Sequence, residues 1–193
     1  MRSKKEFFGQ VKSHVNQGRA LIQDYMNQLA ELNEMINSDS YSANYKRTEV
    51  QPKINRLHKL IDEEQTRVMK SVNEECAAYI NELRNADALD PDQITDDLKL
   101  LQTGIKLRRR DIDALLRRNA DNGTMKQLIL RYCHDNDIET GIHFRGHEPI
   151  VNEVSSIPYT VEVVMRWAGK NESVYERLMG EGSPMEQAFS NEE

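Results

Sequence analysis

The sequence predicts an all-α protein: a long antiparallel helical hairpin over residues 1–86, a small helical module over 90–180 and a flexible acidic tail over 181–193. Three observations predict this fold. Apolar residues in the first part recur at spacings of three and four, the period of a helix packed along one side. Glycine and proline are rare before residue 90, whereas most of the 9 glycines and 5 prolines follow it. Hydrophobic residues make up 38% and aromatic residues 6% of the chain, so a large globular core is not expected.

The first predicted helix begins near Ser3 and ends in the polar run after residue 36. Ser3 and Glu6 have the spacing of a capping box. The a and d positions of four heptads form the predicted seam, with Gly18 as its gap: Phe8, Val11, Val15, Ile22, Tyr25, Leu29, Leu32 and Ile36. Leu21 and Met26 widen this stripe. The pattern fits either the core of one chain or an intermolecular coiled coil, and both remain open.

The second predicted helix opens near Thr48, with Pro52 in its first turn, and continues through Leu83. Both helices are about 35 residues long, roughly 50 Å at ~1.5 Å per residue. Similar lengths joined by a short polar loop favour an antiparallel hairpin. Because two helices bury only one stripe each, we expect the hairpin to self-associate or to dock onto the second half of the chain.

Three short helices are predicted to form the first part of the module. The first begins at Asp90 and Pro91, carries Ile94 inward and ends at Gly104. The second spans 109–119. The third restarts after Gly123 and buries four side chains, Met125, Leu128, Ile129 and Tyr132.

The rest of the module is expected to be less regular. Residues 138–160 contain two prolines and are predicted to be irregular, with a short strand from Ile142 to Phe144. Helices are predicted over 159–168 and 171–179. The Gly-, Ser-, Pro- and Glu-rich segment after residue 181 predicts the flexible tail.

The sequence indicates no enzyme, no metal and no cofactor. It contains none of the glycine-rich nucleotide loops and none of the zinc-protease or serine-hydrolase motifs. The densest set of potential ligands includes Cys133, His134, His143 and His147, but it lacks the spacing of a four-ligand site. Cys76 and Cys133 make no disulfide framework, which favours a reducing compartment. The sequence contains no apolar run of 18 residues, so it predicts no membrane-spanning helix.

One local charge cluster stands out in a chain of net charge −6. Residues 104–131 contain eight basic and three acidic side chains. The predicted partner-binding patch is Arg108, Arg109, Arg110, Arg117 and Arg118. Arginines at a helix N-terminus are disfavoured by the helix dipole, so helix stability does not explain them. Three interpretations stay open: neutralisation by Asp96, Asp97 or the acidic tail, a protein partner, or a nucleic acid.

Three segments carry a resemblance: residues 94–107 (ITDDLKLLQTGIKL), 111–116 (DIDALL) and 122–132 (NGTMKQLILRY). Residues 94–132 resemble proteins encoded among the virion-assembly genes of tailed bacteriophages of Gram-positive hosts. Such proteins commonly have a Ser or Thr capping the middle helix, where this chain has Arg108. The resemblance carries over no functional residues.

The resemblance implies a non-enzymatic phage protein, a virion component or assembly factor acting through protein–protein contacts. Its expected partners are further copies of itself or other phage structural proteins. It is expected in the host cytoplasm during assembly or in the virion, with no membrane contact. The alternative function is a nucleic-acid-binding or inhibitory regulator that uses the basic 104–131 patch, and a nucleic acid is the less favoured partner.

Overall fold

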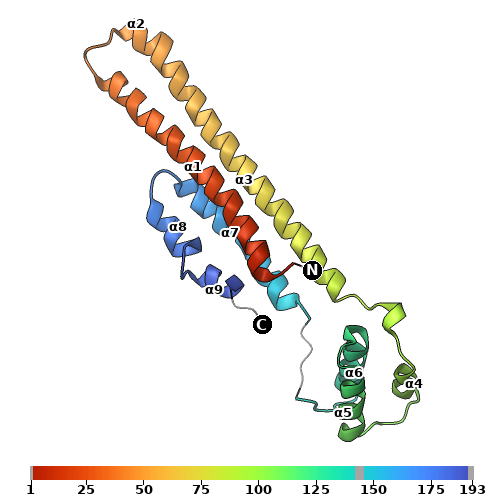
Figure 1. The fold of residues 1–193 in the computed structure, drawn as a ribbon. Helices are drawn as coiled ribbons and strands as arrows, with labels where there is room; N and C mark the ends of the chain where they lie inside the picture. Colours follow the sequence, from red (N-terminus) through yellow and green to blue (C-terminus); the bar gives the residue numbers. More distant parts are fainter. Residues whose placement is uncertain (1, 142–145, 191–193) are drawn as a thin grey trace. The chain divides into compact units, whose positions relative to one another are not determined.

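The computed structural model describes residues 2–141 and 146–190, which are mostly helical and contain no strand. The predicted all-α fold is therefore confirmed. In chain order the helices are α1 (Lys4–Asn37), α2 (Ala43–Tyr45), η1 (Lys46–Val50), α3 (Gln51–Ala86), η2 (Pro91–Gln93), α4 (Asp97–Gln102), α5 (Arg109–Arg118), α6 (Gly123–Asp135), α7 (Glu148–Trp167), α8 (Glu172–Met179) and α9 (Pro184–Ser190) (Figure 1).

The chain forms two compact units. Unit 1 contains Met1–Ile80 and Glu153–Glu193, and unit 2 contains Asn81–Asn152. This division differs from the predicted module over 90–180, because most of α7 and all of α8 and α9 belong to the same unit as the hairpin.

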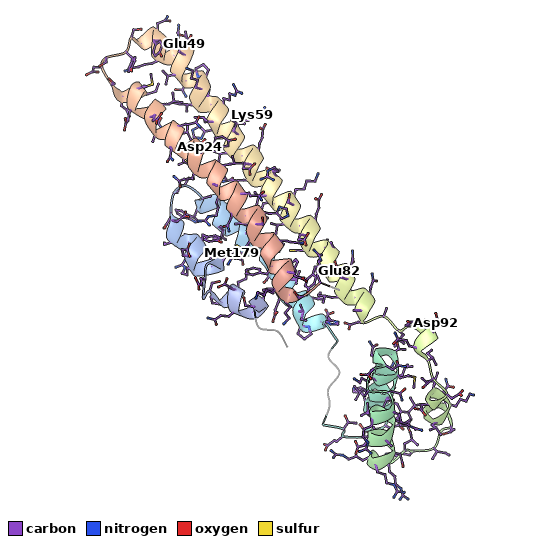
Figure 2. The ribbon with its side chains drawn as sticks, viewed as in Figure 1. Asp24, Glu49, Lys59, Glu82, Asp92 and Met179 are labelled. Carbon is purple, nitrogen blue, oxygen red and sulfur yellow. The ribbon has the colours of Figure 1, made fainter. Side chains whose placement is uncertain are left out.

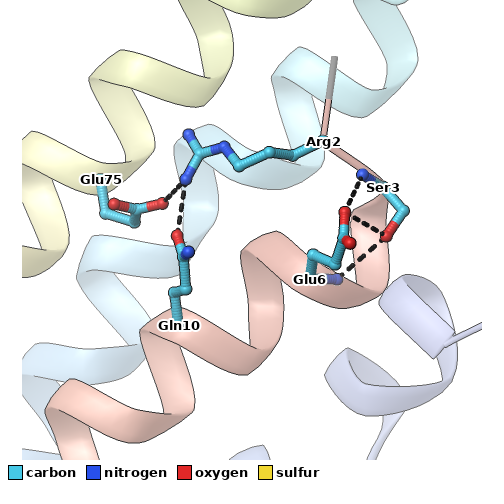
Figure 3. A network of polar contacts seen from close by, with 5 residues as sticks. All are labelled: Arg2, Ser3, Glu6, Gln10 and Glu75. Atoms are coloured by element: carbon cyan, nitrogen blue, oxygen red, sulfur yellow. Dashed lines mark hydrogen bonds and ion pairs between the residues drawn. The ribbon is translucent and has the colours of Figure 1, made fainter.

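The capping box predicted at the start of α1 is present. The backbone N–H of Glu6 donates to Ser3 Oγ (3.2 Å), and the backbone N–H of Ser3 donates to Glu6 Oε2 (2.9 Å) (Figure 3). Arg2 forms an ion pair with Glu75 of α3 and donates to Gln10 Oε1 (2.6 Å). The first turn of α1 is thus both capped and tied to the helix beside it.

α1 packs antiparallel against α3, as predicted (Figure 1). The predicted start of the second helix near Thr48 is wrong, because helical structure begins at α2, where Ser42 Oγ accepts from the backbone N–H of Tyr45 (3.2 Å). Thr48 lies inside η1, a single π-helical turn. This wider turn directly precedes Pro52, whose ring would press on the carbonyl four residues earlier in a regular α-helix.

The seam of α1 lies along the interior of unit 1. Five of its eight residues are buried, namely Phe8, Val11, Val15, Ile22 and Leu29, whereas Tyr25, Leu32 and Ile36 are half-buried. Gly18, the gap in the heptads, is also buried, and Val68 of α3 occupies the space beside it. Phe7, one residue before the seam, stacks on Tyr79 of α3 with ring centroids 4.3 Å apart.

α7 is the third long helix of unit 1. Its Met165 lies beside Gly18, and the Met165 carbonyl accepts a hydrogen bond from Gln65 Nε2 of α3 (3.0 Å). Helix α8 is held to α1 by Arg19, whose guanidinium stacks on the ring of Tyr175 at 3.4 Å. The hairpin therefore docks onto α7 and α8 of the second half of the chain. This is one of the two outcomes expected from the sequence, the other being self-association.

The predicted flexible tail is wrong for residues 184–190, because these residues form α9 against α1. Phe189 is 2% exposed and stacks on Phe8 with ring centroids 5.2 Å apart. Lys12 Nζ also donates to Glu186 Oε1 (2.7 Å). One aromatic side chain and one ion pair therefore order a segment whose composition favours disorder.

The prediction of an irregular segment over 138–160 holds for residues 138–141 and 146–147 but is wrong from Glu148 onward, where α7 begins and contains Pro158. The residues around this proline, Val154, Ile157 and Val161, are fully buried. Their burial, at about 2 kcal/mol per side chain, offsets the hydrogen bond that proline cannot donate. The predicted strand at residues 142–144 lies outside the described residues.

Unit 2 packs its short helices around a small core of Ile112, Leu115, Ile129 and Cys133. Helices α5 and α6 lie close to their predicted bounds. The helix predicted from residue 91 is instead interrupted: η2 is a single turn, Ile94 is extended and exposed, and α4 starts only at Asp97. Gly104 has a φ of +72°, as expected for the residue that ends such a helix.

Candidate partner-binding surface

The arginines of the predicted patch lie at the two ends of α5. Arg108 is the extended residue that precedes the helix, with φ −88° and ψ 159°, and its backbone N–H donates to Asp111 Oδ2 (3.1 Å). Ile112 and Leu115 bury the opposite side of the helix in the core of unit 2. α5 is therefore a surface helix, because its apolar side chains are buried on one side and its arginines are exposed to solvent.

The segment before α5 is fixed by Tyr132 of α6. The Tyr132 hydroxyl donates to the carbonyl of Ile105 (2.9 Å) and accepts from the backbone N–H of Leu107 (3.1 Å). This double contact holds the chain that leads into Arg108. The side chain of Ile105 is 65% exposed, so an apolar residue stands beside the basic cluster.

The five arginines divide into two groups. Arg118 forms an ion pair with Asp97 of α4 (3.1 Å), whose side chain is only 17% exposed. Arg110 and Arg117 are seven residues apart and therefore share one side of α5. All five arginines are exposed, but Arg118 differs from the other four because it forms an ion pair with another helix.

Asn119 is the residue near this surface that sequence reasoning missed. It is 4% exposed, and its Nδ2 donates to Asp97 Oδ2 (2.8 Å) and to the Leu115 carbonyl (2.9 Å). With Arg118, it joins the end of α5 to α4. The available signal was an asparagine directly after the last turn of a predicted helix.

Of the acids expected to neutralise the patch, Asp97 pairs with Arg118, and three others have partners outside the patch. Asp96 pairs with Lys99 (2.6 Å), Glu186 pairs with Lys12 and Glu172 pairs with Arg19. Arg110 lies 3.7 Å from the neighbouring Asp111. Within the described ranges, no carboxylate lies within ion-pair distance of Arg108, Arg109 or Arg117, and all three are exposed.

The candidate metal ligands are dispersed in the structure. His147 Nδ1 lies 2.7 Å from Asp87 Oδ1, and His134 Nδ1 lies 3.3 Å from Asp135. His143 lies outside the described residues. In residues 2–141 and 146–190, no three His, Cys, Asp or Glu side chains are grouped closely enough to hold a metal.

Both cysteines are buried thiols. Burial raises the pKa of Cys76 to about 12. Burial, followed by the charge of Asp113, raises the pKa of Cys133. A thiol in such surroundings is a poor nucleophile at neutral pH, because the reactive form is the thiolate.

Comparison of the chain with protein-family models, with curated proteins and with solved structures finds no match. No helix among the described residues is long and apolar enough to span a bilayer.

Proposed function

We propose that this chain is a non-enzymatic protein of a tailed bacteriophage that acts through protein–protein contacts, as a virion component or an assembly factor. In this role the exposed arginines of α5 hold an acidic segment of the partner. The surface formed by Arg108, Arg109, Arg110 and Arg117 is called the α5 arginine surface below.

One observation carries this proposal: among the described residues, Arg108, Arg109 and Arg117 are exposed and have no carboxylate at ion-pair distance, while Asp96 pairs with Lys99 and Asp97 with Arg118. The dipole of α5 disfavours the three arginines at its start by about 0.3–1 kcal/mol each. Local folding therefore gives no reason for their presence, whereas charge-assisted recognition of carboxylates does.

A protein partner fits this surface better than a nucleic acid. Exposed Ile105 adjoins the arginines, and mixed apolar and arginine side chains are typical of protein interfaces. α5 itself contains no aromatic residue on which a base could stack. The net charge of −6 also gives no long-range attraction to phosphate.

The phage assignment is supported by the resemblance of residues 94–132 to virion-assembly proteins. These residues span α4, α5 and most of α6, so they contain the α5 arginine surface itself. The resembling segment and the candidate contact therefore coincide in the chain.

The test is complementation of a phage from which the gene for this chain has been deleted. The deletion should reduce the yield of infectious particles, and the wild-type gene should restore it. The triple variant Arg108→Ser, Arg109→Asp and Arg110→Glu should fail to restore it, with a loss of at least about tenfold. A control with the same charge change, Lys5→Ser, Lys70→Asp and Lys170→Glu, should restore it.

Two results would contradict this function. Full particle yield from the deleted phage would exclude an assembly role. Alternatively, tight binding of the purified chain to duplex DNA, steeply weakened by salt and abolished in the triple variant, would favour the nucleic-acid-binding regulator.

A further inference from the structure

The outer half of the hairpin contains two long helices, α1 and α3, and the short helical turns that join them. We call it the distal arm: residues 20–61, which comprise the second half of α1, α2, η1 and the first turns of α3. Gly169, which follows α7, packs against Ile22 and Met26. Beyond that level, the described segments show α1 and α3 without a third helix beside them (Figure 1).

Along the distal arm, the seam of α1 widens into an apolar stripe that is only partly covered. Leu21, Tyr25, Gln28, Leu32 and Met35 follow one another at spacings of four and three, which places them along one side of the helix. Leu21 is 43% exposed, and the other three apolar members are half-buried. This stripe is the kind that a neighbouring helix covers.

The stripe faces away from α7. Leu21 and Met26 are five positions apart, a rotation of about 140° around an α-helix. Since α7 ends against Met26, the side that carries Leu21 is not covered by it. On α3, half-buried Leu60 follows Lys53 and Arg56 at the same spacings of three and four.

The two helices of the distal arm have opposite charge. Residues 20–37 contain three acids, Asp24, Glu31 and Glu34, and no base. Residues 46–59 contain five bases and one acid. Figure 2 shows Asp24 on α1 and Lys59 on α3. Within the described part of the chain, Lys59 pairs with Glu63 of its own helix, and no ion pair joins α1 to α3 in the arm.

We propose that a second copy of the chain docks on the distal arm, with α1 of each copy lying along α3 of the other in a four-helix bundle. Two-fold symmetry would cover the Leu21 stripe of both copies at once. It would also place Asp24 and Glu31 of one copy opposite Lys53 and Arg56 of the other. This inference goes beyond the proposed function, because it concerns a different surface and a partner that is the chain itself.

This contact differs from the intermolecular coiled coil considered from the sequence. That coiled coil would use the seam from Phe8 to Ile36, but the structure buries Val11, Val15 and Ile22 within one chain. The stripe proposed here shares Tyr25 and Leu32 with that seam. Both of them stay half-buried, and Leu21 stays exposed, when the buried seam residues are closed within one chain.

Charge reversal followed by mixing tests the proposal. One variant carries Asp24→Lys and Glu31→Lys, and the other carries Lys53→Glu and Arg56→Glu. All four residues are exposed, so each variant should keep the helical circular-dichroism spectrum of the wild type. In sedimentation equilibrium, the wild type should have twice the 22.4 kDa chain mass, and each variant alone should have the mass of one chain. An equimolar mixture of the two variants should regain the double mass, because every contact between unlike copies then pairs opposite charges.

Two controls separate this contact from general effects of charge. Asp121→Lys with Glu139→Lys makes the same change of charge on exposed residues of unit 2 and should leave the mass doubled. Leu21→Gln removes part of the stripe without a charge and should weaken association by about tenfold.

A wild-type chain of single mass would overturn the proposal, as would variants that stay dimeric alone or a mixture that stays monomeric. A single-mass wild type that still supports phage assembly would reject this inference and leave the proposed function standing. If the wild type has the doubled mass but deletion of its gene leaves the particle yield unchanged, the dimer is supported and the proposed function is rejected.

Discussion

Gly18 of α1 lies so close to Val68 of α3 that a methyl group on its Cα would overlap the valine Cγ2. The same methyl position lies 3.1 Å from Met165 Cε of α7 and 3.2 Å from Glu64 Oε1. Three helices of unit 1 therefore meet at this glycine. Gly18 interrupts the heptad pattern of α1, and side chains from α3 and α7 occupy the space that a larger residue would fill.

Gly18→Ala should therefore destabilise the protein despite the higher helix propensity of alanine. Overpacking at this position should lower the free energy of unfolding by about 1–3 kcal/mol. Gly9 is the matched control, since nothing lies within 4 Å of a Cβ placed there. Gly9→Ala should raise the free energy of unfolding by about 0.5–1 kcal/mol. Urea unfolding measures both, and equal gains from the two substitutions would contradict the close approach.

The contact between α9 and α1 should depend on Phe189. Phe189→Ala removes a ring that is buried against Phe8, a change that costs about 3–5 kcal/mol in a fixed core. Because α9 has only seven residues, we expect it to detach and residues 184–190 to become susceptible to limited proteolysis. Exposed Ser190→Ala is the control. Equal resistance of the two variants would indicate that α9 is held by something else.

The same contact should weaken in acid. The hydrogen bond from Lys12 Nζ, followed by that from the Gly182 backbone N–H, holds the pKa of Glu186 below its ordinary value. A carboxyl group with a lowered folded-state pKa stabilises the fold above its ordinary pKa. This stabilisation is lost as the pH falls through the folded-state pKa.

Hydrogen exchange of residues 184–190 between about pH 3 and 7 measures this dependence. Protection should fall at the acid end in the wild type. Lys12→Met removes the main cause of the lowered pKa, so its acid dependence should be smaller. The same pH profile in both proteins would show that the ion pair has no role in holding α9.

Neither cysteine should react while the protein is folded. Cys76 and Cys133 are buried, and both have a raised pKa, so little thiolate is present at neutral pH. Iodoacetamide should modify neither thiol in the native protein at about pH 8, and both after denaturation. Rapid modification of Cys133 in the native protein would show that unit 2 opens easily and that the thiol is accessible.

The sequence predicted the elements whose pattern is local and periodic. The spacing from Phe8 to Ile36 identified the buried side of α1, and Ser3 and Glu6 identified its start. The same spacing does not identify the segment that covers this side. A heptad pattern shows which residues of a helix are apolar, but not which part of the protein packs against them. The choice between an intramolecular core and a coiled coil therefore required α7.

The elements that were missed depend on single residues and distant contacts. Phe189 is one aromatic in a polar segment and produces no periodicity, yet it orders α9. Pro158 suggested a helix break, but burial on both sides of it maintains α7. At the candidate surface, the charges of the arginines were evident from the sequence. Only the structure shows that Arg118 pairs with Asp97 of α4, whereas Arg108 and Arg109 have no ion pair among the described residues.

The thermal unfolding of the Arg108→Ser, Arg109→Asp and Arg110→Glu variant tests most directly the claim that these arginines serve a contact and not the fold. Arg108 has the extended backbone of an N-cap, so serine there can cap α5, and acids in the first turn suit the helix dipole. Arg118→Met is the comparison and should lower the free energy of unfolding by about 0.5–1 kcal/mol, because it removes the partner of Asp97. We predict that the triple variant unfolds at the same or a higher temperature than the wild type. Unfolding at a lower temperature, by as much as Arg118→Met or more, would contradict the claim.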